Sequence, residues 1–367
     1  MKHVSVIGIG KLGLCFSLTL ERSGYNVVGV DVSQEYVDLI NKKEFVSSEA
    51  GVTDALQKAE SFEATTSVES ALSHSDLLFV IVATPSLENG RYDHSQIDSL
   101  LDELEGHGRQ ENQKHLIVCC TTMPGYCDSI TERMNKLNYT VSYNPEFIAQ
   151  GTILRDQERP DMVLIGEANS EIGDILQEIY EKHTTNEPRI CRMSVVEAEI
   201  TKLALNCFLT TKIAYANMIG DIVTRSGGEP STVLSAIGSD SRIGNKYLGY
   251  GYGYGGPCFP RDNRALAIFA ADIGMEAPIS VASDESNSLH LQYQISEFVE
   301  NNSKDEEVCF DFVTYKPEST LLVESQQLAF AVGIAQAGFK VVIREREEVI
   351  SQLKEKYGDL FEYINRS

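Results

Sequence analysis

The chain has 367 residues, 42% of them hydrophobic and 23% charged, which is the composition of a soluble globular protein with more than one core. The formal net charge of −23 argues against nucleic acid or an anionic membrane surface as a partner, because both attract clustered lysine and arginine. No apolar run approaches membrane-spanning length, the N-terminus has no signal-peptide organisation, and the eight cysteines show no zinc-type pairing. We therefore expect a cytoplasmic protein with reduced thiols and no bound metal.

The N-terminal segment predicts a strand at 4–7, a glycine-rich turn, a helix to residue 23 and a second strand at 27–30 that ends at Asp31. In this context a GxGxxG pattern places a dinucleotide pyrophosphate at a helix N-terminus. The acid at the strand end accepts both ribose hydroxyls and repels a 2′-phosphate, which favours NAD over NADP. The alternative is a plain glycine turn. The expected NAD contacts here are Gly8, Ile9, Gly10, Lys11, Leu12, Gly13 and Asp31.

Further strands are predicted at 76–83, 115–120, 140–142 and 162–165, alternating with helix-like segments. This alternation predicts a doubly wound α/β domain of the Rossmann type. Two of these strands run into loops that contain hydroxyl side chains, where open α/β sheets bind ligands. On spacing alone, each loop could equally be a turn capped by Ser or Thr. The residues in question are Thr84, Pro85 and Thr122.

The loop that follows the strand at 140–142 begins with Asn144, Pro145 and Glu146. Because proline excludes the helical conformation at the residue before it, this loop has a defined shape. Glu146 is then placed to activate or position water, although it could be only an exposed loop acid. Phe147, Ile148 and Gln150 continue the loop.

A long helix is predicted from about residue 195 to 225. Lys202 and Asn206 lie one turn apart on it and can point at the same ligand oxygen, although a lysine on a helix is normally exposed to solvent. The helix is apolar on more than one face, which favours burial in a homodimer interface. Its apolar residues include Leu203, Leu205, Phe208, Ile213 and Met218.

Residues 247–256 alternate tyrosine and glycine, and Cys258 follows. The loop could wrap a sugar with backbone N–H groups and offer rings for stacking; the alternative is a flexible linker. Glycines around Cys258 leave its sulfur open, Arg261 favours the thiolate, and Asp262 offers a carboxylate for proton or water chemistry. This combination predicts a nucleophile acting on an aldehyde-level intermediate. The competing interpretation is a buried cysteine beside a tight turn.

The C-terminal segment follows a polar stretch at 301–307 and predicts a strand, a helix, a second strand and a final helix at 308–313, 324–338, 341–344 and 347–357. No later strand is expected, so this is roughly half of a mononucleotide-binding fold. We predict three parts: an NAD-binding domain at 1–190, a central helical dimerisation and substrate domain at 191–300, and a shortened nucleotide-sugar-binding α/β domain at 301–367.

Residues 1–290 resemble the UDP-glucose/GDP-mannose dehydrogenase family, above all at 253–262, at 144–151 and in KLALNCFLTTKIAYAN from Lys202. Those enzymes oxidise a sugar-nucleotide primary alcohol to a carboxylate in two NAD-dependent steps. The resemblance implies that Lys202 and Asn206 polarise the reacting oxygen and stabilise oxyanions. It also implies that Thr122 lies beside the reaction centre and that Arg242 reaches the neighbouring subunit's substrate.

The resemblance implies two sets of ligand contacts. For NAD it adds Thr84, Pro85, Thr122, Gln150 and Arg261 to the glycine-rich turn. For the nucleotide sugar it implies Glu146, Phe147, Ile148, Gln150, Lys202, Asn206, Arg242, Tyr247, Gly249, Tyr252, Gly255 and Lys316.

Three positions depart from the family pattern. Tyr36 stands where a basic residue often follows the ribose acid, Gln150 replaces a second acid, and Val323 replaces an arginine. Since an amide cannot act as a base, Glu146 and Asp262 would carry the proton transfers. The shortened C-terminal part leaves open a domain completed by a partner, or a switch to another sugar derivative.

The predicted function is thus a four-electron, NAD-dependent nucleotide-sugar 6-dehydrogenase acting through Cys258. Two alternatives stay open: a two-electron hydroxy-acid dehydrogenase, which would release one NADH per product instead of two, and a non-catalytic binding relative. The sequence does not name the base or the sugar.

Overall fold

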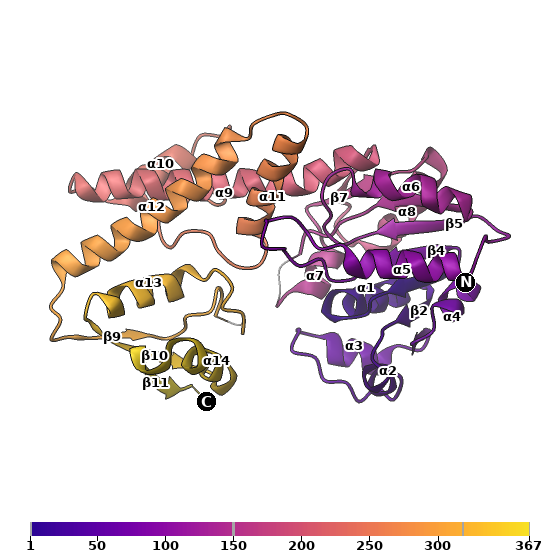
Figure 1. Cartoon of the computed structure of the whole chain (residues 1–367), viewed down its shortest axis with the longest axis horizontal. Coiled ribbons are helices and arrows are strands. Elements are labelled where there is room, and N and C mark those ends of the chain that lie inside the picture. The colour runs from indigo at the N-terminus through magenta and orange to yellow at the C-terminus, as the bar shows by residue number, and fades with distance from the viewer. Residues whose placement is uncertain (1, 149–150, 318, 367) are drawn as a thin grey trace. The chain divides into compact units, whose positions relative to one another are not determined.

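The computed structural model describes residues 2–148, 151–317 and 319–366. The chain forms two compact units, Met1–Lys202 and Leu203–Ser367, and helix α9 (Val195–Arg225) continues from the first into the second (Figure 1). The division into three parts at 190 and 300 stays a prediction. Among the described residues, none of the helices combines the length and the apolar character needed to cross a membrane.

The first unit is built on an eight-stranded sheet in the order β3-β2-β1-β4-β5-β6-β7-β8. Neighbouring strands pair in parallel except β6 and β7, which are antiparallel. The predicted doubly wound α/β domain is confirmed. The strands are β1 (His3–Ile7), β2 (Asn26–Val30), β3 (Phe62–Thr65), β4 (Leu77–Val80), β5 (Lys114–Val118), β6 (Tyr139–Tyr143), β7 (Met162–Gly166) and β8 (Arg189–Met193).

Sequence patterns missed β3 and β8, the two edge strands of this sheet. Both contain charged residues and neither is fully buried, so neither shows the continuous apolar run of a central parallel strand. The central strand β1 is buried from Val4 to Ile7 and was predicted.

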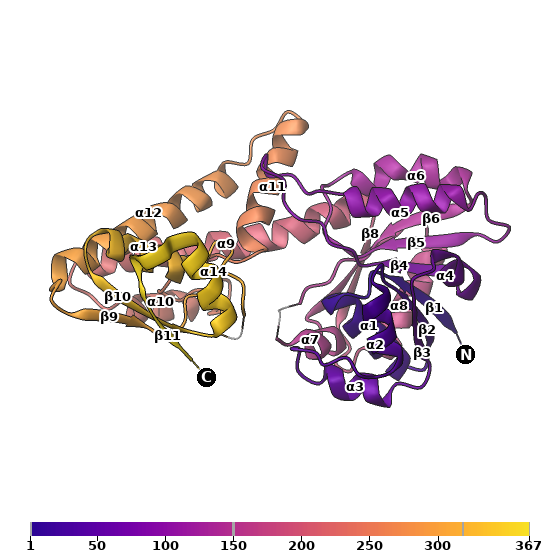
Figure 2. The same cartoon turned by 60° about the horizontal axis from the view of Figure 1, so that its bottom comes forward.

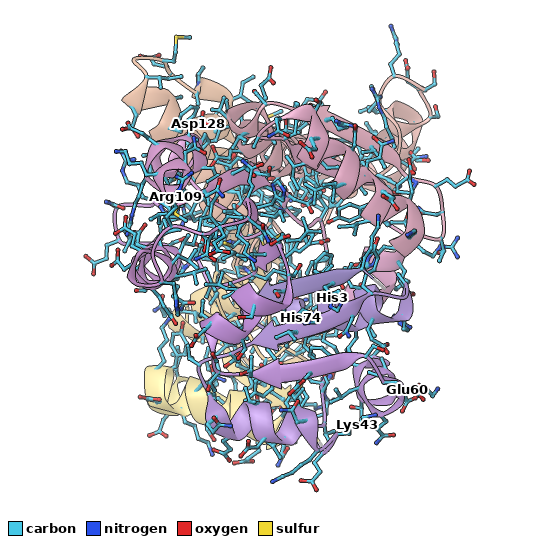
Figure 3. All side chains as sticks on the ribbon, turned by 90° about the vertical axis from the view of Figure 1, so that its right-hand side faces the viewer. His3, Lys43, Glu60, His74, Arg109 and Asp128 are labelled. Carbon is cyan, nitrogen blue, oxygen red and sulfur yellow. The ribbon has the colours of Figure 1, made fainter. Side chains whose placement is uncertain are left out.

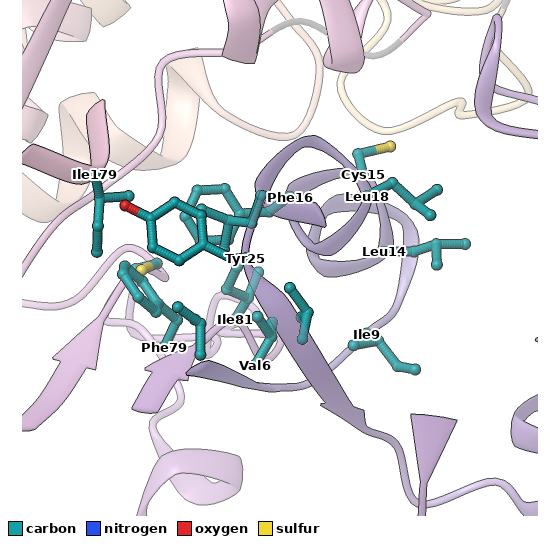
Figure 4. Close-up of a cluster of buried hydrophobic side chains, with 14 of the residues drawn as sticks. Val6, Ile9, Leu14, Cys15, Phe16, Leu18, Tyr25, Phe79, Ile81 and Ile179 are labelled. Carbon is teal, nitrogen blue, oxygen red and sulfur yellow. The ribbon is translucent and has the colours of Figure 1, made fainter. Parts of the chain in front are cut away.

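Helices cover both faces of the sheet. Along β1, Val6 belongs to one buried cluster and Ile7 to the other, so the strand is covered on both sides. In the first cluster Phe16 of α1 packs against Phe79 of β4, near Tyr25 and Ile179 (Figure 4). The helices are α1 (Lys11–Arg22), α2 (Gln34–Asn41), α3 (Val52–Lys58), α4 (Val68–His74), α5 (Ser95–Gly106), α6 (Tyr126–Lys136), α7 (Ile153–Glu158) and α8 (Ser170–His183).

The amino end of β1 is closed by α4. The imidazole rings of His3 and His74 meet edge to face with centroids 4.7 Å apart (Figure 3). The Ser75 hydroxyl donates to the His3 carbonyl at 2.8 Å. The carboxyl end of the sheet, where ligands bind in this fold class, is formed by the loops that follow β1, β4 and β5.

The second unit combines helices with a three-stranded parallel sheet in the order β11-β10-β9 (Figure 2). Its predicted strand–helix–strand–helix run is present, but the expectation of no later strand is wrong. The extra strand β11 is short, polar and mostly exposed, so no apolar pattern marks it. The elements are α10 (Pro230–Gly238), α11 (Phe259–Asp272), α12 (Pro278–Asn301), β9 (Glu307–Phe310), α13 (Gln326–Gln336), β10 (Lys340–Glu345), α14 (Glu347–Tyr357) and β11 (Glu362–Asn365).

The shortened C-terminal part has a core of its own. Phe310 of β9, Ile343 of β10 and Leu353 of α14 are buried in one cluster. Helix α13 packs closely against α12 at Gly333. A Cβ at this position would come 2.3 Å from the Ile295 side chain, so the close approach requires glycine. These 60 or so residues therefore form a packed α/β layer on α12.

Candidate active site

The turn between β1 and α1 fits a dinucleotide. Gly8 has a φ of +91°, and a Cβ there would lie 2.4 Å from the Ile81 carbonyl oxygen. A Cβ at Gly13 would lie 2.0 Å from the Gly8 carbonyl oxygen, whereas a Cβ at Gly10 would meet no atom of the described residues within 4 Å beyond the adjoining chain. The outer glycines are thus required by the turn and by packing, and the middle one leaves the backbone open to a ligand at the α1 N-terminus.

Asp31 follows β2, as predicted for the ribose acid, and its carboxylate accepts the Ser33 N–H at 3.0 Å. Tyr36, which stands in place of the family's basic residue, donates its hydroxyl to the Ile9 carbonyl at 2.9 Å. Burial, together with the negative charge of Asp31, raises the pKa of Tyr36, so the hydroxyl stays a neutral donor. Tyr36 thereby ties α2 to the glycine-rich turn; the contact of Asp31 with ribose stays a prediction.

The loop after β5 is anchored to the start of α9. Thr122 is fully buried and donates its hydroxyl to Glu199 at 2.8 Å. The same carboxylate accepts the backbone N–H of Gly125 at 2.6 Å and of Cys127 at 3.1 Å. Burial raises the pKa of Glu199. No sequence pattern indicated this anchor, because its partners lie more than 70 residues before it in the chain.

The loop after β6 brings Glu146 and Lys202 together. Lys202 donates its ammonium to the Glu146 carbonyl at 2.6 Å and lies 4.4 Å from the centroid of the Phe147 ring. Desolvation of the Glu146 carboxyl raises its pKa to about 7, although the residue is only partly buried. The positive charge of Lys202 acts in the other direction and lowers this pKa, but its effect is smaller. A carboxyl with such a pKa can give or take a proton near neutral pH.

Two residues that sequence reasoning gave no functional role shape this loop. The Tyr180 hydroxyl of α8 lies 2.7 Å from Asn144 Oδ1 and 3.4 Å from the Glu146 carboxyl. Asn144 in turn donates to the Leu164 carbonyl at 2.9 Å, which fixes its amide orientation. Ile148 packs partly buried against the core, while Gln150 lies outside the described residues.

The second unit gathers the residues of the cysteine motif. Asn206 donates its amide to the Asp262 carboxylate at 2.6 Å, and both side chains are buried. Cys258 is the N-cap residue of α11 and is exposed, which removes the buried-cysteine alternative. Arg261 Nε lies 3.4 Å from Asp262. A helix N-terminus and a neighbouring guanidinium both favour a thiolate.

The Tyr–Gly loop, residues 247–256, is ordered by contacts with α9 and α12, so the flexible-linker alternative is wrong. The rings of Tyr247 and Tyr252 are 48% and 39% exposed and are available to a ligand. Tyr247 has a φ of +60°, a left-handed conformation that few non-glycine residues adopt. Gly255 is packed instead: a Cβ there would lie 2.1 Å from the Glu324 carbonyl oxygen.

Four further residues were predicted to contact a ligand: Thr84 and Pro85 in the first unit, and Arg242 and Lys316 in the second. Arg242 is exposed and pairs with Asp240 at 2.7 Å. The Lys316 ammonium lies 5.5 Å from the centroid of the Tyr315 ring. Thr84 is buried in the loop after β4, and the Pro85 carbonyl accepts the Asp93 N–H at 2.8 Å. The roles of these residues toward NAD and substrate stay predictions.

Comparisons with known proteins identify the family of the chain. The sequence model of the NAD-binding domain of the UDP-glucose/GDP-mannose dehydrogenase family matches residues 2–184, and that of its central domain matches residues 196–289. The GDP-mannose 6-dehydrogenase of Pseudomonas aeruginosa is 29% identical over 376 residues, which cover 99% of this chain and 84% of that protein. The UDP-glucose 6-dehydrogenase of the same organism is 29% identical over 354 residues, covering 92% and 78%.

Among solved structures, a UDP-glucose dehydrogenase from the hyperthermophilic archaeon Pyrobaculum islandicum has a TM-score of 0.87 at 27% identity. The similarity covers 100% of this chain and 86% of that chain. Since relatives with different nucleotides in their names match equally well, the comparisons do not select the substrate. The chain belongs to the UDP-glucose/GDP-mannose dehydrogenase family and is an NAD-dependent oxidoreductase.

Proposed function

We propose that the chain oxidises the primary alcohol of a nucleotide sugar to the uronate in two NAD-dependent steps, through a covalent intermediate on Cys258. The observation that carries the proposal is the exposed thiol at the N-terminus of α11, one turn before a buried Asn206–Asp262 pair. A two-electron alcohol dehydrogenase has no need of such a thiol. Relatives named GDP-mannose 6-dehydrogenase and UDP-glucose 6-dehydrogenase support the substrate class.

The proposed reaction consists of two oxidations and one hydrolysis. NAD⁺ would supply the hydride acceptor when bound, one molecule for each of the two oxidations. In the first, the alcohol loses its hydroxyl proton to a base and becomes an aldehyde. The Cys258 thiolate then adds to the aldehyde carbon, and the resulting thiohemiacetal loses a proton and a hydride to become a thioester. Water attacks the thioester, releases the carboxylate and regenerates the thiolate.

The chain's own residues divide this work. The Lys202 ammonium and the Asn206 amide, one turn apart on α9, stabilise the oxyanions that form at each addition. Glu146, whose pKa is raised to about 7, exchanges the proton of the alcohol or of the attacking water. Asp262 orients Asn206 through their 2.6 Å hydrogen bond and is the second candidate for water activation.

The proposed assembly is a cytoplasmic homodimer formed through α9. Phe208, Tyr215 and Ile222 recur at seven-residue intervals along this helix, and their side chains are 66%, 46% and 56% exposed. An apolar stripe of this kind on a long helix suits burial against a second copy. Arg242 would then reach the nucleotide sugar bound by the partner subunit.

An NADH-release screen over UDP- and GDP-sugars tests the function. We expect two NADH per uronate with one nucleotide sugar. One NADH per product would instead assign the chain to two-electron chemistry, and binding of NAD without turnover on any sugar nucleotide would assign it to the non-catalytic class.

A further inference from the structure

The Tyr–Gly loop is held on one side by a row of polar side chains that no site prediction included. On α12 the row consists of Asp284, Asn287, His290 and Gln294, whose three- and four-residue spacing places them on one helix face. On α9 it continues with Asn217 and Asp221, one turn apart. All six lie outside the cysteine motif, and each of them forms a hydrogen bond with the loop between Tyr250 and Tyr254.

Two asparagines bind the loop backbone as a neighbouring strand would. Asn287 accepts the Tyr254 N–H and donates to the Tyr254 carbonyl, both at 2.9 Å. Asn217 accepts the Gly251 N–H at 3.1 Å and donates to the Tyr252 carbonyl at 3.3 Å. Each amide therefore satisfies a backbone donor and a backbone acceptor at once, which fixes the peptide planes of the loop.

His290 links the loop to α9 through both of its ring nitrogens. Its ring is buried; Nδ1 lies 2.8 and 2.9 Å from the two Asp221 carboxylate oxygens, and Nε2 lies 2.7 Å from the Gly251 carbonyl oxygen. Both partners can only accept a hydrogen bond. His290 therefore bridges the Asp221 carboxylate and the backbone of the loop. Asp221 also accepts the Tyr250 hydroxyl at 2.9 Å, and Gln294 donates to the same Gly251 carbonyl at 3.1 Å.

The opposite side of the loop is open. A Cβ at Gly253 would lie 2.2 Å from Asn287 Oδ1, so this glycine lets the loop approach α12. At Gly249 and Gly251 a Cβ would meet no other atom of the described residues within 4 Å beyond the adjoining chain, and neither glycine has a left-handed φ. Neither packing nor a turn explains these two glycines. A ligand that approaches the backbone closely does explain them.

We propose that His290, Asn287, Asn217 and Asp221 are positioning residues that hold residues 249–254 in the conformation that binds the nucleotide sugar. The inference rests on the proposed function for the identity of the ligand. Its physical basis is preorganisation: a glycine-rich loop loses much conformational entropy when it is ordered, and the two helices impose that order before the substrate arrives.

Hydrogen exchange of the substrate-free protein, combined with steady-state kinetics, tests the inference. In Asn287→Ala and in His290→Leu we expect exchange in peptides covering residues 249–255 to rise about tenfold or more, since each loses a buried hydrogen bond to the loop. The KM for the nucleotide sugar should rise more than kcat falls. His290→Gln keeps a donor for the Gly251 carbonyl and should lie between His290→Leu and wild type.

The matched control is Gln292→Ala, at an exposed position on the same helix, which should change neither exchange nor KM. Asn217→Ala on α9 provides an independent variant, with its effect centred on the Gly251 amide. The inference would be overturned if Asn217→Ala and whichever of Asn287→Ala and His290→Leu fold showed unchanged hydrogen exchange in peptides covering residues 249–255. Because exchange needs no substrate, a chain that shows the expected exchange but no turnover would overturn the proposed function separately.

Discussion

At the scale of single residues, Cys207 and Cys258 differ in the environment of their thiol groups. Cys207 lies one residue after Asn206, and burial, reinforced by the charge of Asp262, raises its pKa to about 12. Cys258, at the start of α11, is exposed at a helix N-terminus. The glycines around Cys258 were sufficient to predict its accessible sulfur from the sequence, because they are local, whereas no sequence pattern indicated that Cys207 is buried. The loop contacts of Glu199 and Tyr180 were not predictable, because their partners are distant in the chain.

Replacement of Cys258 by serine should abolish uronate formation, with kcat lower by about a thousandfold or more, because an alcohol is a far weaker nucleophile than a thiolate. Stability should change by less than about 1 kcal/mol, since the side chain is exposed. The measurements are uronate yield and thermal unfolding. Cys309→Ser removes the other exposed thiol of the second unit and should keep full activity. Uronate formation at the wild-type rate in Cys258→Ser would exclude the covalent intermediate.

The pKa of Glu146 gives a pH dependence whose sign can be worked out. A base acts when ionised, and with a pKa of about 7 the ionised fraction of Glu146 falls as the pH is lowered through neutrality. We expect kcat/KM to fall about tenfold per unit below pH ~7. Glu146→Gln should lose most of the activity and the steep acid limb together, whereas Glu63→Gln, at an exposed position of β3, should retain both. A wild-type profile that is flat from about pH 6 to 8 would contradict this role.

At the scale of elements, local patterns gave the buried strands and the long helices. Helix α9 and helix α14 begin and end where the periodicity placed them. The edge strands β3, β8 and β11 carry polar, partly exposed residues and give no such signal. The conformation of the Tyr–Gly loop could not be predicted from its own residues either. Its composition indicates turns, whereas hydrogen bonds from side chains of α9 and α12 fix its backbone conformation.

Two glycines of this loop should respond differently to alanine. In Gly249→Ala the new methyl group points into open space, so stability should change by less than about 1 kcal/mol while the KM for the nucleotide sugar rises. In Gly253→Ala the methyl group clashes with the Asn287 amide, which hydrogen bonds to the loop hold in place. The free energy of unfolding should therefore fall by about 1–3 kcal/mol. Chemical denaturation and kinetics of both variants check this. Equal loss of stability in the two would show that Gly249 is required by the fold.

At the scale of the whole molecule, a net charge of −23 opposes an anionic nucleotide sugar, so binding depends on local donors. The C-terminal layer has a buried hydrophobic core of its own within the second unit. Its one basic residue matched to the family pattern is Lys316, and the predicted arginine position is occupied by Val323. In the proposed shared site a second copy would supply a further cation, because the Arg242 side chain is exposed.

The shared site makes a quantitative prediction for mixed dimers. Cys258→Ser and Arg242→Ala chains are each expected to be inactive alone. In a mixed dimer, the chain with an intact Cys258 receives Arg242 from its partner, so one of the two sites is complete. Random exchange makes half of the dimers mixed, and the mixture should regain about a quarter of the wild-type activity. The measurement is NADH release after subunit exchange, with light scattering to establish the dimer. Phe208→Glu in both chains places charge on the exposed stripe of α9, and should prevent both assembly and recovery. A monomeric wild type, or a dimer that regains nothing on mixing, would exclude the shared site.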